Sequence, residues 1–110
     1  MRSKIALLSG AFLLASTSVA LGAVDADAAQ ALMKVSHCGK CHALDKKKDG
    51  PPYKETAKKY QGKADAEQKL YTHLTTNSKV KVEGKEEEHT ALKTKKEDDV
   101  RNVVRWILSR

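Results

Sequence analysis

The spacing of apolar residues after about residue 24 predicts a helical domain. The segment from Asp27 to Ser36 has apolar residues at i, i+3, i+4 and i+7, and Asp27 can cap its first turn. A shorter helix is expected over residues 53–60, and Asp65 is placed to cap a third. The faces expected to be buried are Ala28, Ala31, Leu32 and Val35 in the first helix, Tyr53, Ala57 and Tyr60 in the second, and Ala66, Leu70 and Leu74 in the third.

The last helix has the clearest pattern. Thr94 followed by Glu97 has the spacing of a capping box. Between the third and last helices, residues 77–90 are rich in charge and have no helical period. Val80 and Val82 alternate with lysines there, but the run is too short to indicate a strand, so we expect a loop and an all-α fold. The apolar stripe of the last helix comprises Val100, Val103, Val104, Ile107 and Leu108.

Residues 1–23 have the pattern of a secretory signal peptide. Arg2 and Lys4 give a positive start, the apolar stretch from Ile5 to Leu14 follows, and small residues come next. A membrane anchor is the alternative, but the apolar run is far shorter than the roughly 20 residues that a spanning helix needs. We therefore expect residues 24–110 to be a single domain, exported to the periplasm, with no stable membrane insertion after cleavage.

Composition adds two limits. The chain has 110 residues, of which only 5% are aromatic, so few large side chains are available to form the core of one small domain. A large apolar group bound to the native state would add stability. The formal net charge of +7 would allow nucleic acid, a membrane surface or an acidic protein as a partner. Export places the domain away from nucleic acid.

Cys38-Gly39-Lys40-Cys41-His42 is a C-x-x-C-H motif, which is typical of covalent haem attachment. Two thiols so spaced can add across two vinyl groups on one edge of a porphyrin, and His42 then lies under the iron as the proximal ligand. A ligating imidazole usually donates its other N–H to a carbonyl. The turn at residues 50–52, which contains Pro51, is well placed to supply that carbonyl, although its prolines could simply end the charged loop before it.

Three other interpretations of the two cysteines are weaker. A zinc site needs four ligands, and a second pair with zinc-finger spacing is missing. A thioredoxin-like redox pair needs a βαβ setting, which the pattern does not predict. A chance motif fits poorly with the adjacent His42 and the preceding export signal.

These features resemble the small bacterial class I cytochromes c. The resemblance lies in the stretch CHALDKKKDGPPYKETAKKYQGKADAEQKL and in the ending VRNVVRWILS, and it spans residues 27–110. It implies an all-α fold whose first and last helices pack together near one covalent haem c. It also implies that Trp106 is the aromatic residue at that contact and that the Pro51 carbonyl accepts from His42.

The chain departs from this family at the distal ligand. The family's usual ligand is a methionine in the loop before the last helix, and no methionine follows the haem motif here. Met1 is expected to leave with the signal peptide. Met33 lies five residues before Cys38 on the first helix, so it is poorly placed to reach the opposite face of the haem.

His89 lies in the loop where the resemblance implies the distal ligand. It is 47 residues after His42 and 17 before Trp106. It could instead be a solvated residue of a charged loop, with the iron left five-coordinate. His73, on a helix that could line the pocket, is the rival ligand, and an open or unforeseen sixth site is the third alternative. His37 is too close to the motif to reach the other face.

Two axial histidines would leave no vacant position for a substrate and would lower the reduction potential relative to methionine ligation. We therefore expect a monomeric one-electron carrier with bis-His ligation and not an enzyme. A haem-based gas sensor or a small peroxidase is the alternative function. Lysines near the motif could steer redox partner proteins with acidic docking surfaces, or could be an ordinary solvated surface. They are Lys40, Lys46, Lys47, Lys48, Lys54, Lys58 and Lys59.

Overall fold

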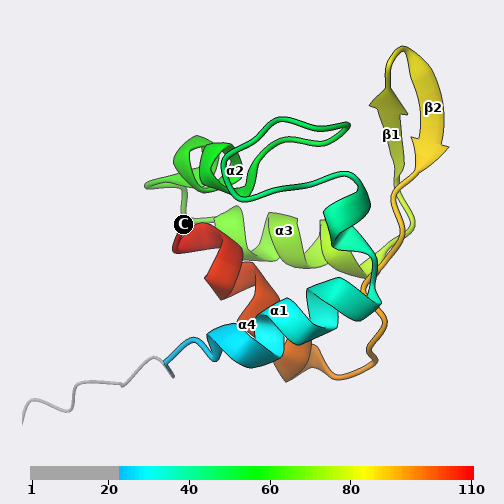
Figure 1. The fold of residues 1–110 in the computed structure, drawn as a ribbon. Helices are drawn as coiled ribbons and strands as arrows, with labels where there is room; N and C mark the ends of the chain where they lie inside the picture. The colour runs from blue at the N-terminus through cyan, green and yellow to red at the C-terminus, as the bar shows by residue number, and fades with distance from the viewer. Residues whose placement is uncertain (1–22) are drawn as a thin grey trace, which may run out of the picture.

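A computed structural model describes residues 23–110. In this range the chain forms four α-helices, a 3₁₀ turn and a two-stranded hairpin (Figure 1). The elements are α1 (Ala26–Val35), η1 (Cys38–Lys40), α2 (Tyr53–Tyr60), α3 (Ala66–Thr75), β1 (Lys79–Val82), β2 (Lys85–Glu88) and α4 (Glu97–Leu108). No helix within residues 23–110 is long and apolar enough to cross a membrane. The predicted signal peptide lies outside the described residues except for its last position.

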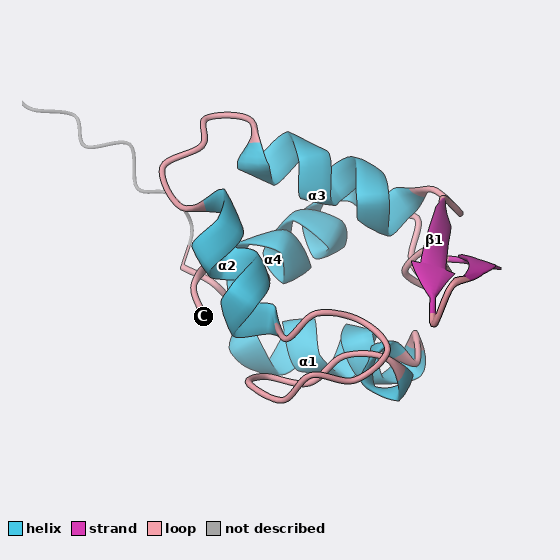
Figure 2. Ribbon diagram, turned by 90° about the horizontal axis from the view of Figure 1, so that it is seen from above, coloured by secondary structure: helices cyan, strands magenta, loops and turns pink. Residues whose placement is uncertain are grey.

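The other helices pack around α4. It contacts α1, α2 and α3, and Figure 2 shows it between them. The apolar stripe of α4 is a major source of stability, because burying a valine or isoleucine side chain contributes about 1.5–3 kcal/mol. The all-α architecture with the first and last helices packed together is confirmed. The buried residues of α4 are Val100, Val103, Val104, Trp106 and Ile107.

The buried faces of α2 and α3 agree with the prediction, whereas that of α1 does not. In α1 the buried residues are Ala29 and Met33, and Val35 is 55% exposed. Two apolar stripes run along this helix, and α4 packs against the one that carries the large Met33 side chain. The predicted stripe was wrong because the pattern within α1 does not show which of its two apolar stripes α4 will cover. The residues buried as predicted are Ala57 in α2 and Ala66, Leu70 and Leu74 in α3.

The N-cap of α1 lies two residues before the predicted one. The N-cap is Asp25, whose carboxylate accepts a hydrogen bond from the Ala28 N–H at 3.0 Å. Asp27 lies in the first turn instead, where a negative charge is still favourable near the positive end of the helix dipole. Asp65 is the N-cap of α3, but its carboxylate pairs with Lys69 at 3.0 Å.

The predicted capping box of α4 is not formed. The helix begins at Glu97, one residue after Lys96, so Thr94 lies too far upstream to cap it. The Thr94 hydroxyl accepts from the Lys96 N–H at 3.2 Å and donates to Asp99. The Glu97 carboxylate contacts Arg101 at 2.8 Å.

A hairpin occupies part of the segment that was predicted to be a loop. β1 and β2 pair antiparallel, with Lys79 opposite Glu88 and Lys81 opposite Glu86. The turn residues Glu83 and Gly84 have φ of 49° and 77°, as a two-residue hairpin turn requires. The loop prediction was wrong because the strands are only four residues long and their apolar side is only half-buried, so the pattern is weak. Opposite charges across the ladder and the turn geometry favour the pairing instead.

Candidate functional site

The C-x-x-C-H motif forms a tight turn directly after α1. His37 has a φ of 60° and starts the turn. The N–H groups of Cys41 and His42 both donate to the Cys38 carbonyl, at 3.2 and 3.0 Å. Both thiols are half-buried, and burial raises the pKa of the Cys38 thiol. The turn therefore presents two thiols and, in the next residue, an imidazole.

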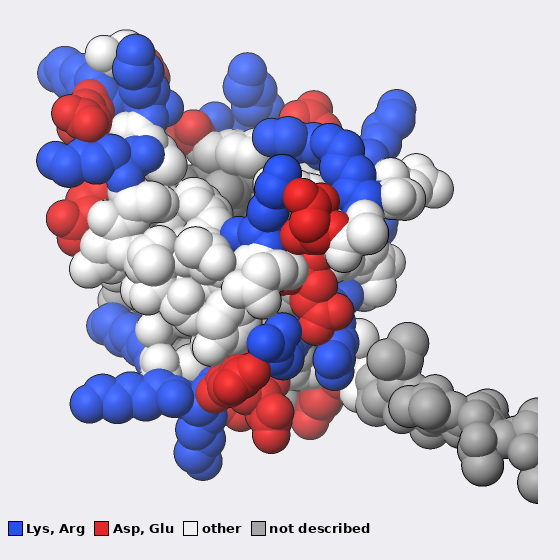
Figure 3. All heavy atoms as spheres, turned by 180° about the vertical axis from the view of Figure 1, so that it is seen from behind, with Lys and Arg blue, Asp and Glu red and all other residues white. Residues whose placement is uncertain are grey.

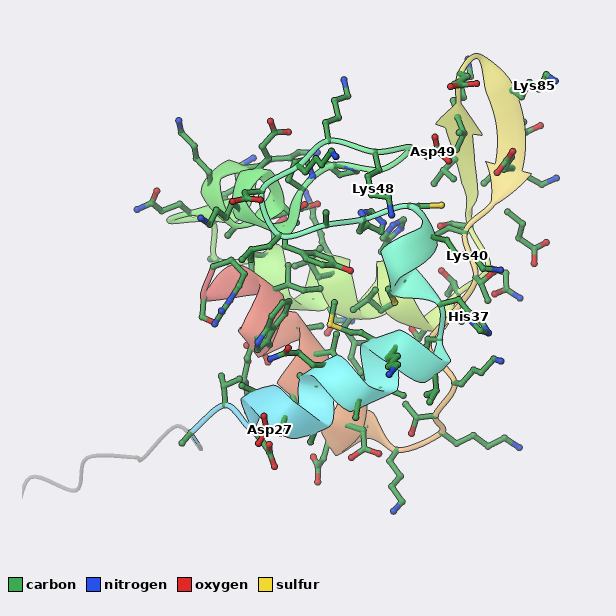
Figure 4. All side chains as sticks on the ribbon, viewed as in Figure 1. Asp27, His37, Lys40, Lys48, Asp49 and Lys85 are labelled. Carbon is green, nitrogen blue, oxygen red and sulfur yellow. The ribbon has the colours of Figure 1, made fainter. Side chains whose placement is uncertain are left out.

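The loop after the motif folds back against it. Gly50 donates to the Cys41 carbonyl at 2.7 Å, and Tyr53 donates to the Ala43 carbonyl at 2.9 Å. The Lys48 ammonium donates to the Gly39 carbonyl from the same side, near Lys40 (Figure 4). The chain thus forms a closed loop that fixes the residues on either side of His42.

His42 is held from two directions. Its Nδ1 lies 2.8 Å from the Pro51 carbonyl, so the contact predicted for this turn is present. Because a carbonyl can only accept, Nδ1 donates, and in the neutral ring the lone pair is then on Nε2. The Tyr53 ring stacks on the imidazole with centroids 5.5 Å apart, and Trp106 packs edge-on against Tyr53, also at 5.5 Å.

Gly50 makes a close approach that the sequence did not indicate. A Cβ at this position would come within 3.0 Å of three atoms of the His42 ring. Only glycine therefore fits here without displacing the imidazole. A lone glycine before two prolines signals a turn, but it does not reveal which side chain the turn touches.

His89 directly follows the hairpin. Its N–H donates to the Ser78 carbonyl at 2.7 Å, and this hydrogen bond joins the two ends of the hairpin. The ring centroids of His42 and His89 are 6.2 Å apart. An imidazole centroid lies about 3 Å from a metal that its nitrogen binds at about 2 Å, so the centroids of two imidazoles on opposite sides of one ion are about 6 Å apart. The observed spacing fits one metal ion between these rings.

His73, on α3, lies beside His89. The two ring centroids are 3.9 Å apart, and Nδ1 of His73 is 3.3 Å from the Ser78 hydroxyl. Burial and the nearby His42 lower the pKa of His73. Burial, together with His73 and His42, lowers the pKa of His89 to about 4. Both rings are therefore neutral at neutral pH, the form in which an imidazole binds metals.

Two buried ring nitrogens have no hydrogen-bond partner among residues 23–110, namely Nδ1 of His89 and Nε1 of Trp106. Buried polar atoms rarely lack a partner. The His89 ring faces the His42 ring, and the Trp106 ring packs against Tyr53, which stacks on His42. Two thiols with two imidazoles are a donor set suited to a covalently attached haem.

Two side chains that hold the loop after His89 by hydrogen bonds were not predicted from the sequence. The buried Ser36 hydroxyl accepts from the Lys93 N–H at 2.9 Å. The Asn77 side-chain carbonyl accepts from the Ala91 N–H, also at 2.9 Å. Each is a small polar residue just after a helix, where such side chains often pair with free backbone groups. That general tendency was the only signal for them.

Met33 and His37 lie apart from the facing imidazoles. Met33 is buried in the core with Ala29 and the residues of α4. His37 is exposed and is directed away from the helices (Figure 4).

Comparison with known proteins gives consistent matches. The family model described as cytochrome c matches residues 26–110. Cytochrome c-551 of Pseudomonas aeruginosa is 41% identical over 73 residues, which cover 66% of this chain and 67% of that protein. Among solved structures, the class 1 cytochrome MtoD of Sideroxydans lithotrophicus ES-1 is 52% identical, with a TM-score of 0.75 over 79% of this chain and 97% of that one. Nitrosomonas europaea cytochrome c552 is 25% identical, with a TM-score of 0.57 over 73% of this chain and 96% of that one.

Proposed function

Because the chain belongs to the cytochrome c family of haem c electron carriers, we propose that it is an exported carrier whose haem lies between His42 and His89. Haem c, when bound, supplies an iron that accepts and releases one electron. Cys38 and Cys41 attach the group by adding their S–H bonds across its two vinyl groups. The residues of the chain then control ligation, potential and access.

The observation that carries the axial assignment is the 6.2 Å between the centroids of His42 and His89. The Pro51 carbonyl fixes His42 with its unprotonated nitrogen free. The low pKa of His89, about 4, keeps its ring neutral and able to bind. These two side chains thus offer lone pairs from opposite sides of the same space.

Occupation of both axial positions suits electron transfer. Neither side of the group is left open to a substrate, and two fixed imidazoles need to move little when the charge between them changes. Imidazole in place of a thioether also favours the ferric state, so we expect a lower potential than in relatives that use methionine.

The signal-like residues 1–23 support a periplasmic location, and the basic surface supports docking to acidic redox partners. Lys40 is part of the haem motif, and Lys48 lies beside it, with its ammonium donating to the Gly39 carbonyl (Figure 4). Figure 3 shows lysine and arginine side chains also at the rear of the molecule, with acidic residues between them. Attraction of an acidic partner would therefore arise both from the lysines near the motif and from the excess of positive charge.

Covalent attachment can be tested directly on the exported protein. We expect acid–acetone treatment to leave the haem on the polypeptide, and the pyridine haemochrome spectrum to indicate two thioether links. In matched single variants, Cys38→Ser and Cys41→Ser, we expect the spectrum of one link. Extraction of free haem from the unaltered protein would contradict the proposal.

A further inference from the structure

We infer that His73 and Ser78 form a clamp that positions the His89 ring. The inference rests on the proposed function, in which His89 is the distal ligand. His73 and Ser78 together are the distal clamp. Neither residue is taken to bind the metal, so each would act through its contact with His89.

Ser78 connects the two histidines. Its hydroxyl lies 3.3 Å from Nδ1 of His73, and its carbonyl accepts the N–H of His89 at 2.7 Å. One residue thereby orients the His73 ring and fixes the backbone from which the His89 ring projects. Because β1 begins immediately after Ser78 and β2 ends immediately before His89, the hairpin holds these two positions together.

His73 provides a firm surface for the ring of His89. The two ring centroids are 3.9 Å apart, with the planes inclined by 34°. Leu70 and Leu74, on the same helix, are buried against the core, so α3 cannot easily shift. A ring packed this closely against a fixed neighbour has little freedom to rotate.

The two axial imidazoles differ in what restrains them. Nδ1 of His42 is held by the Pro51 carbonyl at 2.8 Å. Nδ1 of His89 is buried and has no hydrogen-bond partner within residues 23–110. Packing against His73 is therefore the contact that can restrict the ring plane of His89. We conclude that His73 is a positioning residue on the distal side.

The clamp can be tested on the ferric holoprotein by two measurements, the rate of cyanide binding and the EPR g values. Cyanide binding requires His89 to leave, and the g values depend on the orientation of the axial rings. We expect His73→Ala to raise the cyanide rate about tenfold, as is typical when a residue supporting a metal ligand is removed. We expect Ser78→Ala to raise it less and Ser78→Thr to restore it, because threonine retains the hydroxyl.

The matched control is Thr72→Ala, which changes the neighbouring exposed residue of α3 and should leave the rate and the g values unchanged. His73→Phe keeps a flat ring without the Ser78 contact, so its rate should fall between the wild type and His73→Ala. Wild-type rates and g values in both alanine variants would overturn the clamp while leaving His89 as the ligand. Loss of the low-spin state in His73→Ala but not in His89→Ala would instead overturn the ligand assignment.

Discussion

At the scale of single residues, the site depends on how closely the backbone approaches His42. Gly50 lies against the imidazole, and the next residue, Pro51, accepts its hydrogen bond. One turn thus fixes both the position of the ring and the nitrogen that carries the proton when the ring is neutral. Gly39, between the two cysteines, has no heavy atom within 4 Å of the place where a Cβ would be.

Gly50→Ala should therefore disturb His42, and Gly39→Ala should not. The added methyl group must displace the ring or the turn, at a cost of about 1–3 kcal/mol for overpacking. We expect a lower free energy of unfolding in urea and a loss of ferric low-spin signal for Gly50→Ala alone. Equal behaviour of the two variants would contradict the close approach seen at Gly50.

At the scale of secondary-structure elements, α1 is joined to α4 by one polar side chain as well as by the core. The Asn102 side chain accepts from the Asp25 N–H at 2.9 Å and donates to the Asp25 carbonyl at 2.8 Å. Asp25 is also the N-cap of α1. These bonds therefore hold the start of the first helix against the last helix.

Asn102→Ala should destabilise the fold through this contact. Two hydrogen bonds are lost, each contributing about 0.5–1.5 kcal/mol, so a decrease of about 1–3 kcal/mol in the free energy of unfolding is expected. Urea unfolding monitored by circular dichroism measures it. Gln30→Ala, at an exposed position of α1, serves as the control and should change stability little. A variant as stable as the control would show that the core alone holds the two helices together.

The helices could be predicted because their signal is local. The stripe from Val100 to Ile107 repeats at helical spacing and is buried against the other helices. The hairpin gives no such signal, since its strands are short and its two turn residues are identified only by their positive φ. The face of α1 depended on which of two stripes α4 covers, and that is decided by packing between segments distant in sequence.

The candidate site shows the same difference between local signals and contacts that depend on the fold. The motif from Cys38 to His42 and the turn at Pro51 are close in sequence, so their contact could be predicted. The close approach of Gly50 to His42 and the packing of His73 against His89 could not, because each depends on contacts that only the folded chain makes. The sequence left His73 as a rival ligand to His89, and we propose that it supports His89 instead, since the two ring centroids are 3.9 Å apart.

At the scale of the whole molecule, the formal net charge of +7 falls to +5 when Arg2 and Lys4 leave with the predicted signal peptide, and this positive charge should govern encounters with charged reagents. We expect oxidation of the reduced protein by ferricyanide, which is anionic, to slow as salt is added, because ions screen the attraction. A cationic cobalt complex should show the opposite trend and serves as the control. Stopped-flow rates that are flat with ionic strength for both reagents would exclude steering by charge.

The central claim is that His89 is the distal ligand, and the EPR spectrum of the ferric holoprotein tests it most directly. We expect the unaltered protein to be low-spin and His89→Ala to become high-spin, with the iron accessible to water. His73→Ala should remain low-spin, because it retains both ligands. A low-spin His89→Ala protein would contradict the account, and a high-spin His73→Ala protein beside it would assign the distal position to His73.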